Sequence, residues 1–344
     1  MTWYLESGPA CDVVLSTRVR LARNLDGTPF PWRLSDRELA DVKVRVTDAF
    51  KAICASSSGA LIVDLGTLDA IETLALAERR VISRDMLRHA ERKALLLFPG
   101  ESQGILVNEE DHLRIYAVGA GLCLNETLDD VMRCARSMEA KLSFAKTDRM
   151  GYLTACPTNT GTGMRASAML HVPALARAGV LPRMTEHLAR AGYALRGAGG
   201  EGTGMTGDVI QLSNQVTLGV TEAKLTEDLE RLILDVADEE RRARQALLDE
   251  DPVGLLDAIG RAKGRLMFAH QLTTDEAMES LSLVRLGREL ELSNMPDYDV
   301  IQSLWVGVGA GVIQQEAGRP LSAQARDEAR ADKVREALAS GIKS

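Results

Sequence analysis

The chain has 344 residues, of which 45% are hydrophobic and 26% charged, as in an ordinary globular protein. These proportions exclude a wholly disordered chain, and the length predicts roughly two domains. With 41 Lys+Arg against 49 Asp+Glu the formal charge is -8, and only 4% of the residues are aromatic. We therefore expect no general binding of nucleic acid.

The predicted elements begin with a strand over Val13–Leu21, where apolar residues alternate with Arg18 and Arg20. This alternation places both arginines on one face of the strand. Ser35 and Glu38 then form a capping box ahead of residues with helical spacing, which predicts a helix that reaches the region of residue 53.

Further strands and helices follow without a strict alternation. Thr127 is expected to cap a helix, and a short buried strand is expected over residues 60–65. The irregular order favours an α+β class with a mainly antiparallel sheet flanked by helices. The other predicted strands cover residues 105–118, 152–156 and 208–220.

The composition changes near residue 221. Residues 222–251 carry 11 acidic and 5 basic side chains with leucines at helical spacing, and Pro252–Ser344 shows several helices and no strand. We therefore predict a first domain over residues 1–235 and an all-helical C-terminal domain over residues 236–344.

The five cysteines form no Cys-x-x-Cys pair, which argues against a zinc knuckle or a disulfide framework. The first residues show no signal-peptide pattern, and no apolar run reaches the ~18 residues that span a bilayer. We expect a soluble cytoplasmic protein with no contact to a membrane and no metal held by its own side chains.

Gly202–Gly207 fits a glycine pattern that is found in dinucleotide-binding and protein-kinase loops. A dinucleotide fold needs a helix after the glycines, but the next residues alternate like a strand. A protein kinase needs HRD and DFG motifs, and both are absent from the sequence. The segment is therefore an ordinary loop or a loop that closes over a ligand.

Several arginines lie beside predicted strands or glycines, and guanidinium groups hold phosphate oxygens bidentately. For any one of these arginines taken alone, a solvated surface cation is the favoured interpretation. In Asn108–Arg114 the consecutive acids favour a turn, whereas a continuing strand would place Glu110, His112 and Arg114 on one face. For His112 we expect a structural role. The candidate arginines are Arg18, Arg20, Arg114, Arg165 and Arg196.

Cys156–Ser167 predicts a strand, a polar turn and then a helix that continues through Met169. A helix N-terminus favours a thiolate and binds anions, so Cys156 is a candidate reactive thiol. The alternative is a buried, inert cysteine.

Together, four segments resemble the ordered signature set of the phosphagen (guanidino) kinase superfamily. They are Ser16–Arg20, Asn108–Arg114, Cys156–Ser167 and Arg196–Glu201. Within the superfamily the chain resembles the bacterial protein-arginine kinases, because Arg326–Ala331 fits their RDxxRA motif. We also expect it to lack the N-terminal helical domain of the small-molecule kinases.

The resemblance implies a phosphagen-kinase-like sheet and the transfer of the ATP γ-phosphoryl group to arginine side chains in proteins. Glu110 and Glu201 would hold the substrate guanidinium, Cys156 would contact it, and Mg²⁺ would be held through the nucleotide phosphates. An allosteric phosphoarginine site would use Arg326, Asp327, Arg330 and Ala331. Arg80 stands where the family usually has a histidine near the adenine. The implied nucleotide-binding residues are Ser16, Thr17, Arg18, Val19, Arg20, Arg80, Arg114, Arg165, Ala166, Ser167, Ala168, Met169, Arg196, Gly197, Ala198, Gly199, Gly200 and Glu201.

The resemblance also implies partners: protein substrates with exposed arginine, a zinc-binding activator protein, a Clp-type AAA+ unfoldase and a second copy of the chain. Two alternatives remain open. One is a kinase of a small free guanidino compound, and the other is a non-catalytic reader of phosphoarginine.

Overall fold

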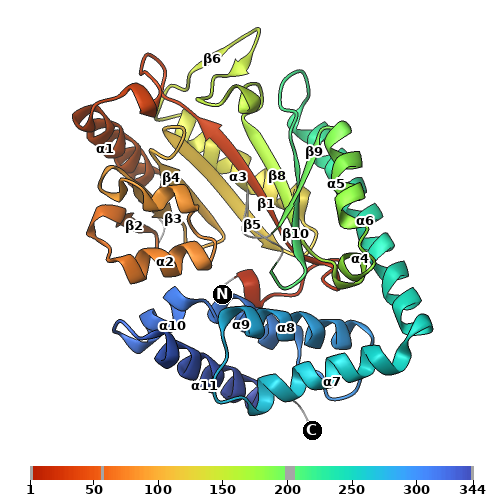
Figure 1. The fold of residues 1–344 in the computed structure, drawn as a ribbon. Coiled ribbons are helices and arrows are strands. Elements are labelled where there is room, and N and C mark those ends of the chain that lie inside the picture. The colour runs from red at the N-terminus through yellow and green to blue at the C-terminus, as the bar shows by residue number, and fades with distance from the viewer. Residues whose placement is uncertain (1–2, 56–57, 198–205, 342–344) are drawn as a thin grey trace.

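The computed structural model describes residues 3–55, 58–197 and 206–341. In these residues a single sheet runs in the order β2-β3-β4-β5-β1-β8-β10-β9, and every neighbouring pair is antiparallel (Figure 1). The strands are β1 (Val14–Arg23), β2 (Leu61–Asp64), β3 (Ala94–Leu97), β4 (Gln103–Val107), β5 (Leu113–Ala120), β8 (Met164–His171), β9 (Tyr193–Gly197) and β10 (Val209–Asn214); β6 (Lys146–Thr147) and β7 (Gly151–Tyr152) form a separate hairpin.

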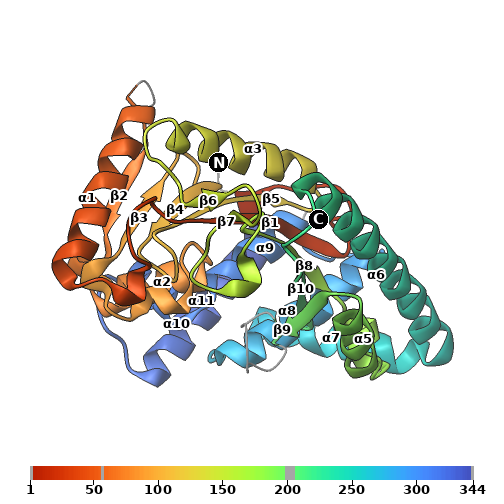
Figure 2. The same ribbon diagram turned by 90° about the horizontal axis from the view of Figure 1, so that it is seen from above.

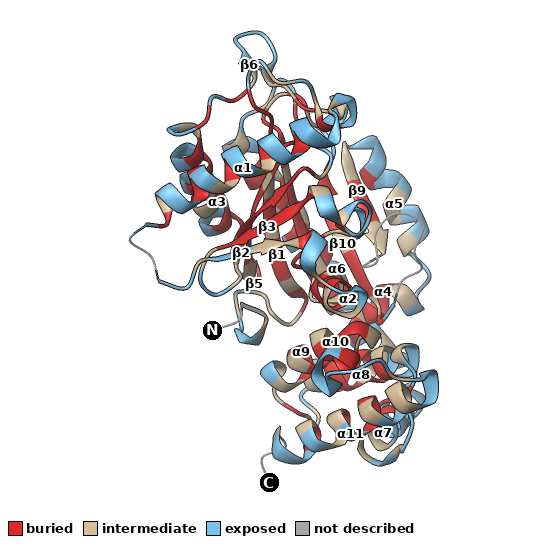
Figure 3. Cartoon of the chain, turned by 90° about the vertical axis from the view of Figure 1, so that its left-hand side faces the viewer, coloured by how far each residue is buried: buried red, intermediate tan, exposed pale blue. Residues whose placement is uncertain are grey.

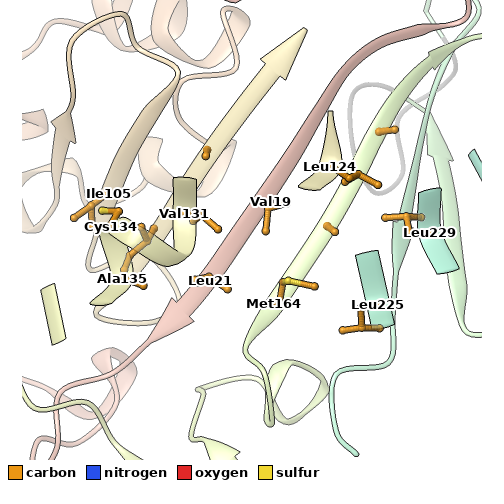
Figure 4. Packing of buried hydrophobic residues seen from close by; sticks show 14 of the residues in the cluster. Val19, Leu21, Ile105, Leu124, Val131, Cys134, Ala135, Met164, Leu225 and Leu229 are labelled. Carbon is orange, nitrogen blue, oxygen red and sulfur yellow. The ribbon is translucent and has the colours of Figure 1, made fainter. Parts of the chain in front are cut away.

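One face of the sheet is covered by helices α1 (Asp36–Ile53), α3 (Leu124–Glu139) and α6 (Glu222–Glu250), as Figure 2 shows from above. Val19 of β1 points to this face and is fully buried. It shares one core with Val131 of α3 and Leu229 of α6 (Figure 4). This core holds β1 and β8 rigidly at the centre of the sheet.

The opposite face is covered only in part. Beside β3, β4 and β5, helix α2 (Ala70–Glu78) and the irregular segment after it bury a second cluster that includes Leu76, Met86 and Tyr116. This cover ends at Tyr116 of β5. The neighbouring side chains of β1, β8 and β10 on this face therefore border cavities.

The C-terminal helices form a bundle with its own buried cluster, which includes Leu281, Leu304 and Val334 (Figure 3). The bundle contacts the rest of the chain near α2, where the Glu78 carboxylate accepts hydrogen bonds from the Gly311 and Val312 amides. The remaining helices are α4 (Pro173–Arg177), α5 (Leu181–Arg190), α7 (Pro252–Phe268), α8 (Thr274–Glu289), α9 (Tyr298–Gly307), α10 (Ala310–Ala317) and α11 (Ala323–Gly341).

Helix α6 connects the two parts of the chain. It runs without a break through residues 235 and 236, where we divide the domains. Near its C-terminal end the buried Glu240 carboxylate accepts hydrogen bonds from the Ala174 and Leu175 amides at the start of α4 and pairs with Arg244 at 2.8 Å. The connecting helix is thus fixed to the sheet domain through a buried charge pair.

The α+β class, the helical C-terminal region, the β1 strand and the capping box of Ser35 and Glu38 are confirmed. Thr127 is not a cap: its hydroxyl donates to the Cys123 carbonyl inside α3, which begins at Leu124. The strand expected over residues 60–65 lies at the sheet edge, so Leu61 is 53% exposed rather than buried.

Three predicted strands are shorter than expected. The 105–118 segment is two strands joined by a turn at residues 108–112, because Asn108 adopts a φ of 56° that ends β4. The 208–220 strand ends at Asn214, whose side chain bonds to the Met164 and Val216 carbonyls. From 152–156 only Tyr152 is in a strand.

Replacing Glu240 with Ala should lower the free energy of unfolding by about 3–5 kcal/mol, because the change removes both the nearest acidic partner of the buried Arg244 and the acceptor of the Ala174 and Leu175 amides. Glu239→Ala is the matched control on the same helix, since Glu239 pairs with Arg242 on the exposed surface. The control should cost at most about 1 kcal/mol. Urea unfolding of both variants measures the difference, and equal midpoints would contradict this role for Glu240.

Candidate active site

Strands β1 and β8 supply the cationic wall of the site. Arg20 lies opposite Arg165, and Arg18 lies opposite Ser167, in the antiparallel register. Directly opposed residues share a face of a sheet. The prediction that Arg18 and Arg20 share one face is therefore confirmed, and Arg165 joins them.

These strands border an open cavity of about 970 Å³. Residues far apart in the sequence meet in it, because they come from β1, β5, β8, β9 and the loops that join them. The cavity brings together six predicted site residues: Arg20, Glu110, Arg114, Cys156, Arg165 and Arg196.

Arg20 shows the electrostatic character of this cavity. Burial, and next the charges of Arg114 and Arg18, lower the pKa of the Arg20 guanidinium to about 9. Its buried Nε has no hydrogen-bond acceptor in the part of the chain that the structure describes. A guanidinium group with such a free donor, standing among other arginines, fits the oxygens of a polyphosphate.

Arg114 is held in place by two acidic neighbours. Its Nη1 pairs with Glu109, whose side chain is only 1% exposed, and its Nη2 lies 3.1 Å from Glu110. The Ser83 hydroxyl also donates to Glu109. Glu109 therefore positions the arginine, a role that sequence reasoning misses because a run of acids gives no sign of which member is buried.

Glu110 projects into the cavity with 45% of its side chain exposed. Burial raises the pKa of its carboxyl group, and the charge of Arg114 acts in the opposite direction. A carboxylate that is partly desolvated and stands beside cations can orient a substrate cation and accept a proton from it.

The turn at residues 108–112 holds Glu110 through its neighbours. Asp111 accepts hydrogen bonds from the Asn24 amide at 2.6 Å and from the Ala155 backbone at 2.7 Å. His112 is fully buried, and its Nδ1 accepts from the Leu25 amide at 3.0 Å. Burial lowers the pKa of His112 to about 4, so the ring is neutral at neutral pH.

The turn alternative for this segment is thus confirmed, and the shared face of a continuing strand is wrong. His112 has the structural role expected of it. The same hydrogen bonds tie the turn to residue 155, next to Cys156. This link explains how two separate loops present Glu110 and Cys156 to one cavity.

The helix predicted after Cys156 is wrong. A short 3-10 turn covers Pro157–Asn159, and the chain then enters strand β8 at Met164. Gly161 and Gly163 adopt φ angles of 118° and 63°, which let the chain reverse between them. The helix N-terminus expected to favour a thiolate is therefore absent from this described segment; the Cys156 sulfur instead lies 2.9 Å from the Thr158 hydroxyl.

Three other predicted residues line a separate cavity of about 300 Å³ beside the C-terminal helices: Ser16, Arg80 and Met169. The Arg80 Nη1 lies 3.1 Å from the Met169 sulfur, and the Arg80 carbonyl accepts from Arg18 at 2.6 Å. Arg18 also lies over the Tyr116 ring, 5.3 Å from its centroid. Arg80 and Arg18 are thus neighbours, as an adjoining subsite requires.

Some predicted residues do not reach either cavity. Val19 and Ala166, which oppose each other in the sheet, belong to the helix-covered core, and Ala168 joins them. Thr17 also lies on that face, where its hydroxyl is 3.0 Å from the Cys123 sulfur. Gly197 ends β9, and the predicted residues Ala198, Gly199, Gly200 and Glu201 lie outside the described residues.

The RDxxRA segment lies on α11. Arg330 is buried and donates from Nε to the Val308 carbonyl at 2.7 Å and from Nη1 to the Leu272 carbonyl at 2.5 Å. Its Nη1 also lies 2.7 Å from Asp327. Arg326 is half-buried and donates to the Leu321 carbonyl. Ala331 is fully buried.

Within the three described ranges, no group of His, Cys, Asp and Glu side chains could hold a metal ion. None of the helices described there combines the length and the apolar character needed to cross a membrane.

Comparisons with known proteins agree with this arrangement. The sequence model described as "ATP:guanido phosphotransferase, C-terminal catalytic domain" matches residues 41–243, and the one described as "Protein-arginine kinase McsB C-terminal domain" matches residues 252–343. Protein-arginine kinase of Moorella thermoacetica is 39% identical over 98% of this chain and 97% of its own length. That of Brevibacillus brevis is 37% identical over 98% and 94%.

Solved structures show the same fold at lower identity. Lombricine kinase superposes with a TM-score of 0.59 over 70% of this chain and 71% of its own, at 21% identity. The duplicated taurocyamine kinase of Schistosoma mansoni gives 0.61 over 78% of this chain and 41% of its own, at 23% identity. The chain belongs to the ATP:guanido phosphotransferase family and carries the C-terminal domain of its protein-arginine kinase branch.

Proposed function

We propose that this chain is a protein-arginine kinase, which transfers the γ-phosphoryl group of ATP to the guanidinium of arginine side chains in proteins. The observation that carries the proposal is the cavity where four of the predicted arginines meet Glu110 and Cys156. Such a cavity offers guanidinium groups for a polyphosphate and, at Glu110, a carboxylate for a substrate guanidinium. Phosphoryl transfer depends mainly on this kind of positioning and charge stabilisation.

The nucleotide phosphates would be held by Arg18, Arg20, Arg114, Arg165 and Arg196, with Mg²⁺ bound through the phosphates. Glu109 keeps Arg114 in place. The fit rests on the buried Arg20 Nε, which needs an acceptor, and on the shared face of Arg18, Arg20 and Arg165.

Glu110 would orient the substrate guanidinium and accept its proton, since a protonated guanidinium is a poor nucleophile. Cys156 would contact the same cation. Glu201, named by its place in the family motif, would act with Glu110, and the segment around it would cover the site.

A protein substrate, rather than a small guanidino compound, is supported by the full-length similarity to protein-arginine kinases and by the matched C-terminal domain. The same proposal includes the binding partners of the chain and its location in the cell. They are a zinc-binding activator protein, a Clp-type AAA+ unfoldase, a second copy of the chain and a cytoplasmic location. The division into domains at residues 235 and 236 likewise stays a prediction.

The C-terminal motif would form an allosteric site for phosphoarginine. Arg326 and Asp327 are half-buried on α11 and can meet a phosphoryl group and a guanidinium-derived tail. Arg330 is buried, and its guanidinium already donates hydrogen bonds to the Val308 and Leu272 carbonyls. It could contact a ligand only after these hydrogen bonds rearrange.

Incubation with ATP and casein should give casein phosphorylated on arginine, while free arginine should be a poor substrate. Glu110→Gln should lower turnover by roughly 10²–10⁴, as for the loss of a general base, and leave ATP binding nearly intact. Glu126→Gln, an exposed position on α3, is the control. Mass spectrometry of casein and calorimetry with ATP give the two readouts.

Faster turnover of free arginine than of casein would instead indicate the small-molecule kinase. Phosphoarginine binding without any turnover would indicate a non-catalytic reader of phosphoarginine. Wild-type turnover in Glu110→Gln would remove the carboxylate from the mechanism.

Cys156 should react with iodoacetamide at neutral pH faster than Cys54 and Cys134. Burial raises the pKa of the Cys54 thiol and raises that of the Cys134 thiol to about 12, whereas Cys156 borders the open cavity. ATP with casein should protect Cys156. Peptide mapping measures each site, and equal labelling of the three thiols, or no protection, would leave Cys156 without a place beside the substrate.

Arg326→Ala combined with Asp327→Ala should abolish phosphoarginine binding and preserve basal ATP turnover, because both residues lie on α11 and line neither cavity described above. Glu336→Ala, exposed on the same helix, is the control. Calorimetry with phosphoarginine measures the affinity. An unchanged affinity in the double variant would leave these residues as an ordinary charged helix.

A further inference from the structure

Two loops form the rim of the larger cavity beside Cys156. Thr158, in the turn after Cys156, lines the cavity, and so does Gln215, in the loop between β10 and α6. The buried Thr217 hydroxyl of that loop donates to the Thr158 carbonyl at 2.8 Å and to the Thr160 carbonyl at 2.9 Å. The loop after β10 is therefore fastened to the same turn that presents Cys156.

The β6–β7 hairpin packs against this turn from the other side. The Tyr152 amide donates to the Gly161 carbonyl at 2.8 Å, and the Gly161 amide donates back at 3.2 Å. Gly161 also lies against the loop, since a Cβ added there would stand 2.9 Å from the Leu218 Cα. Hairpin, turn and loop thus meet at Gly161, and Figure 1 shows the hairpin and the loop toward the same end of the sheet.

The loop and the hairpin expose apolar side chains at this junction. Thr217 is buried, but its neighbours Val216 and Leu218 are 48% and 54% exposed. Met150, next to the hairpin residue Gly151, is 43% exposed. Single exposed apolar residues are ordinary, whereas several that gather beside a polar cavity are typical of a surface that binds another molecule. We call Met150, Val216 and Leu218 the apolar rim.

The other side of the cavity is charged. Asp85, Arg88 and His89 line it from the segment that follows α2 and covers β3, β4 and β5. The loop with the apolar rim follows β10, so β1 and β8 separate the two sides. A substrate that reaches the cavity with apolar neighbours around its reacting group therefore finds a matching surface on the side of Cys156.

We infer that the apolar rim binds apolar side chains that flank the target arginine in a protein substrate. The inference rests on the proposed function, because it takes a protein arginine as the group that enters the cavity beside Cys156. Successive residues of an extended chain are only roughly 3.4 Å apart, so such an arginine brings its neighbours to the rim. Removing their apolar surface from water adds affinity that free arginine lacks.

Two synthetic peptides test the inference. Each carries one arginine, which is flanked by glycines in the first peptide and by leucines two residues away on both sides in the second. Wild-type kcat/KM should be roughly tenfold or more higher for the leucine peptide, the gain expected from burying one apolar side chain. Val216→Ser combined with Leu218→Ser should remove most of this preference, with the change in KM rather than in kcat.

The matched control is Val253→Ser combined with Leu256→Ser, because both residues are exposed on α7 and neither lines the cavity. The control should keep the wild-type preference. Met150→Ser should reduce the preference by a smaller factor than the loop variant. Calorimetry with ATP should give the same affinity for all of these proteins, which separates a lost docking surface from a damaged phosphate site.

Equal kcat/KM for the two peptides in the wild-type chain would overturn the inference, as would an unchanged preference in the Val216→Ser and Leu218→Ser variant. Failure of the proposed function has a different signature, since the wild-type chain would then phosphorylate neither peptide and no casein. That result would remove the inference together with the function on which it rests.

Discussion

The crowding of guanidinium groups on one face of the sheet is the constraint on which the site depends. Arg18, Arg20 and Arg165 share that face, and their mutual repulsion adds to the cost of burying them. The surrounding structure offsets part of this cost, through Glu109 at Arg114, the Tyr116 ring at Arg18 and the Asn214 carbonyl at Arg165. A bound polyanion would supply the acceptor that the buried Arg20 Nε lacks among the described residues.

The rigid core behind the sheet makes this arrangement possible. Val19 and Ala166 oppose each other on the covered face, one residue away from Arg20 and Arg165 on the open face. Because successive side chains of a strand alternate, tight packing on one side fixes the positions of the charges on the other. A strand held less firmly would let the arginines separate.

The same alternation explains what can be predicted from the sequence. The spacing of Arg18 and Arg20 is enough to predict their shared face, and the capping box at Ser35 is enough to locate a helix start. The run of acids favours the turn around Glu110, but the position of that turn is harder to predict, because it depends on hydrogen bonds from Asn24 and Ala155, which are distant in sequence. The segment of β8 suggests a helix instead, because small residues, Ala166 and Ala168, lie on its covered face and the apolar Met169 lies on its open face, which weakens the alternation.

Arg330 has a consequence for communication between distant ligands. Its guanidinium donates to the Leu272 carbonyl, just before α8, and to the Val308 carbonyl, just after α9. A single side chain thus links these two helices, and both of them line the cavity that Met169 of the sheet domain also lines. Any ligand that draws Arg330 away from these carbonyls changes the free energy of that helix pair. By thermodynamic reciprocity, whatever occupies the space beside α8 and α9 must alter the affinity for that ligand by the same factor.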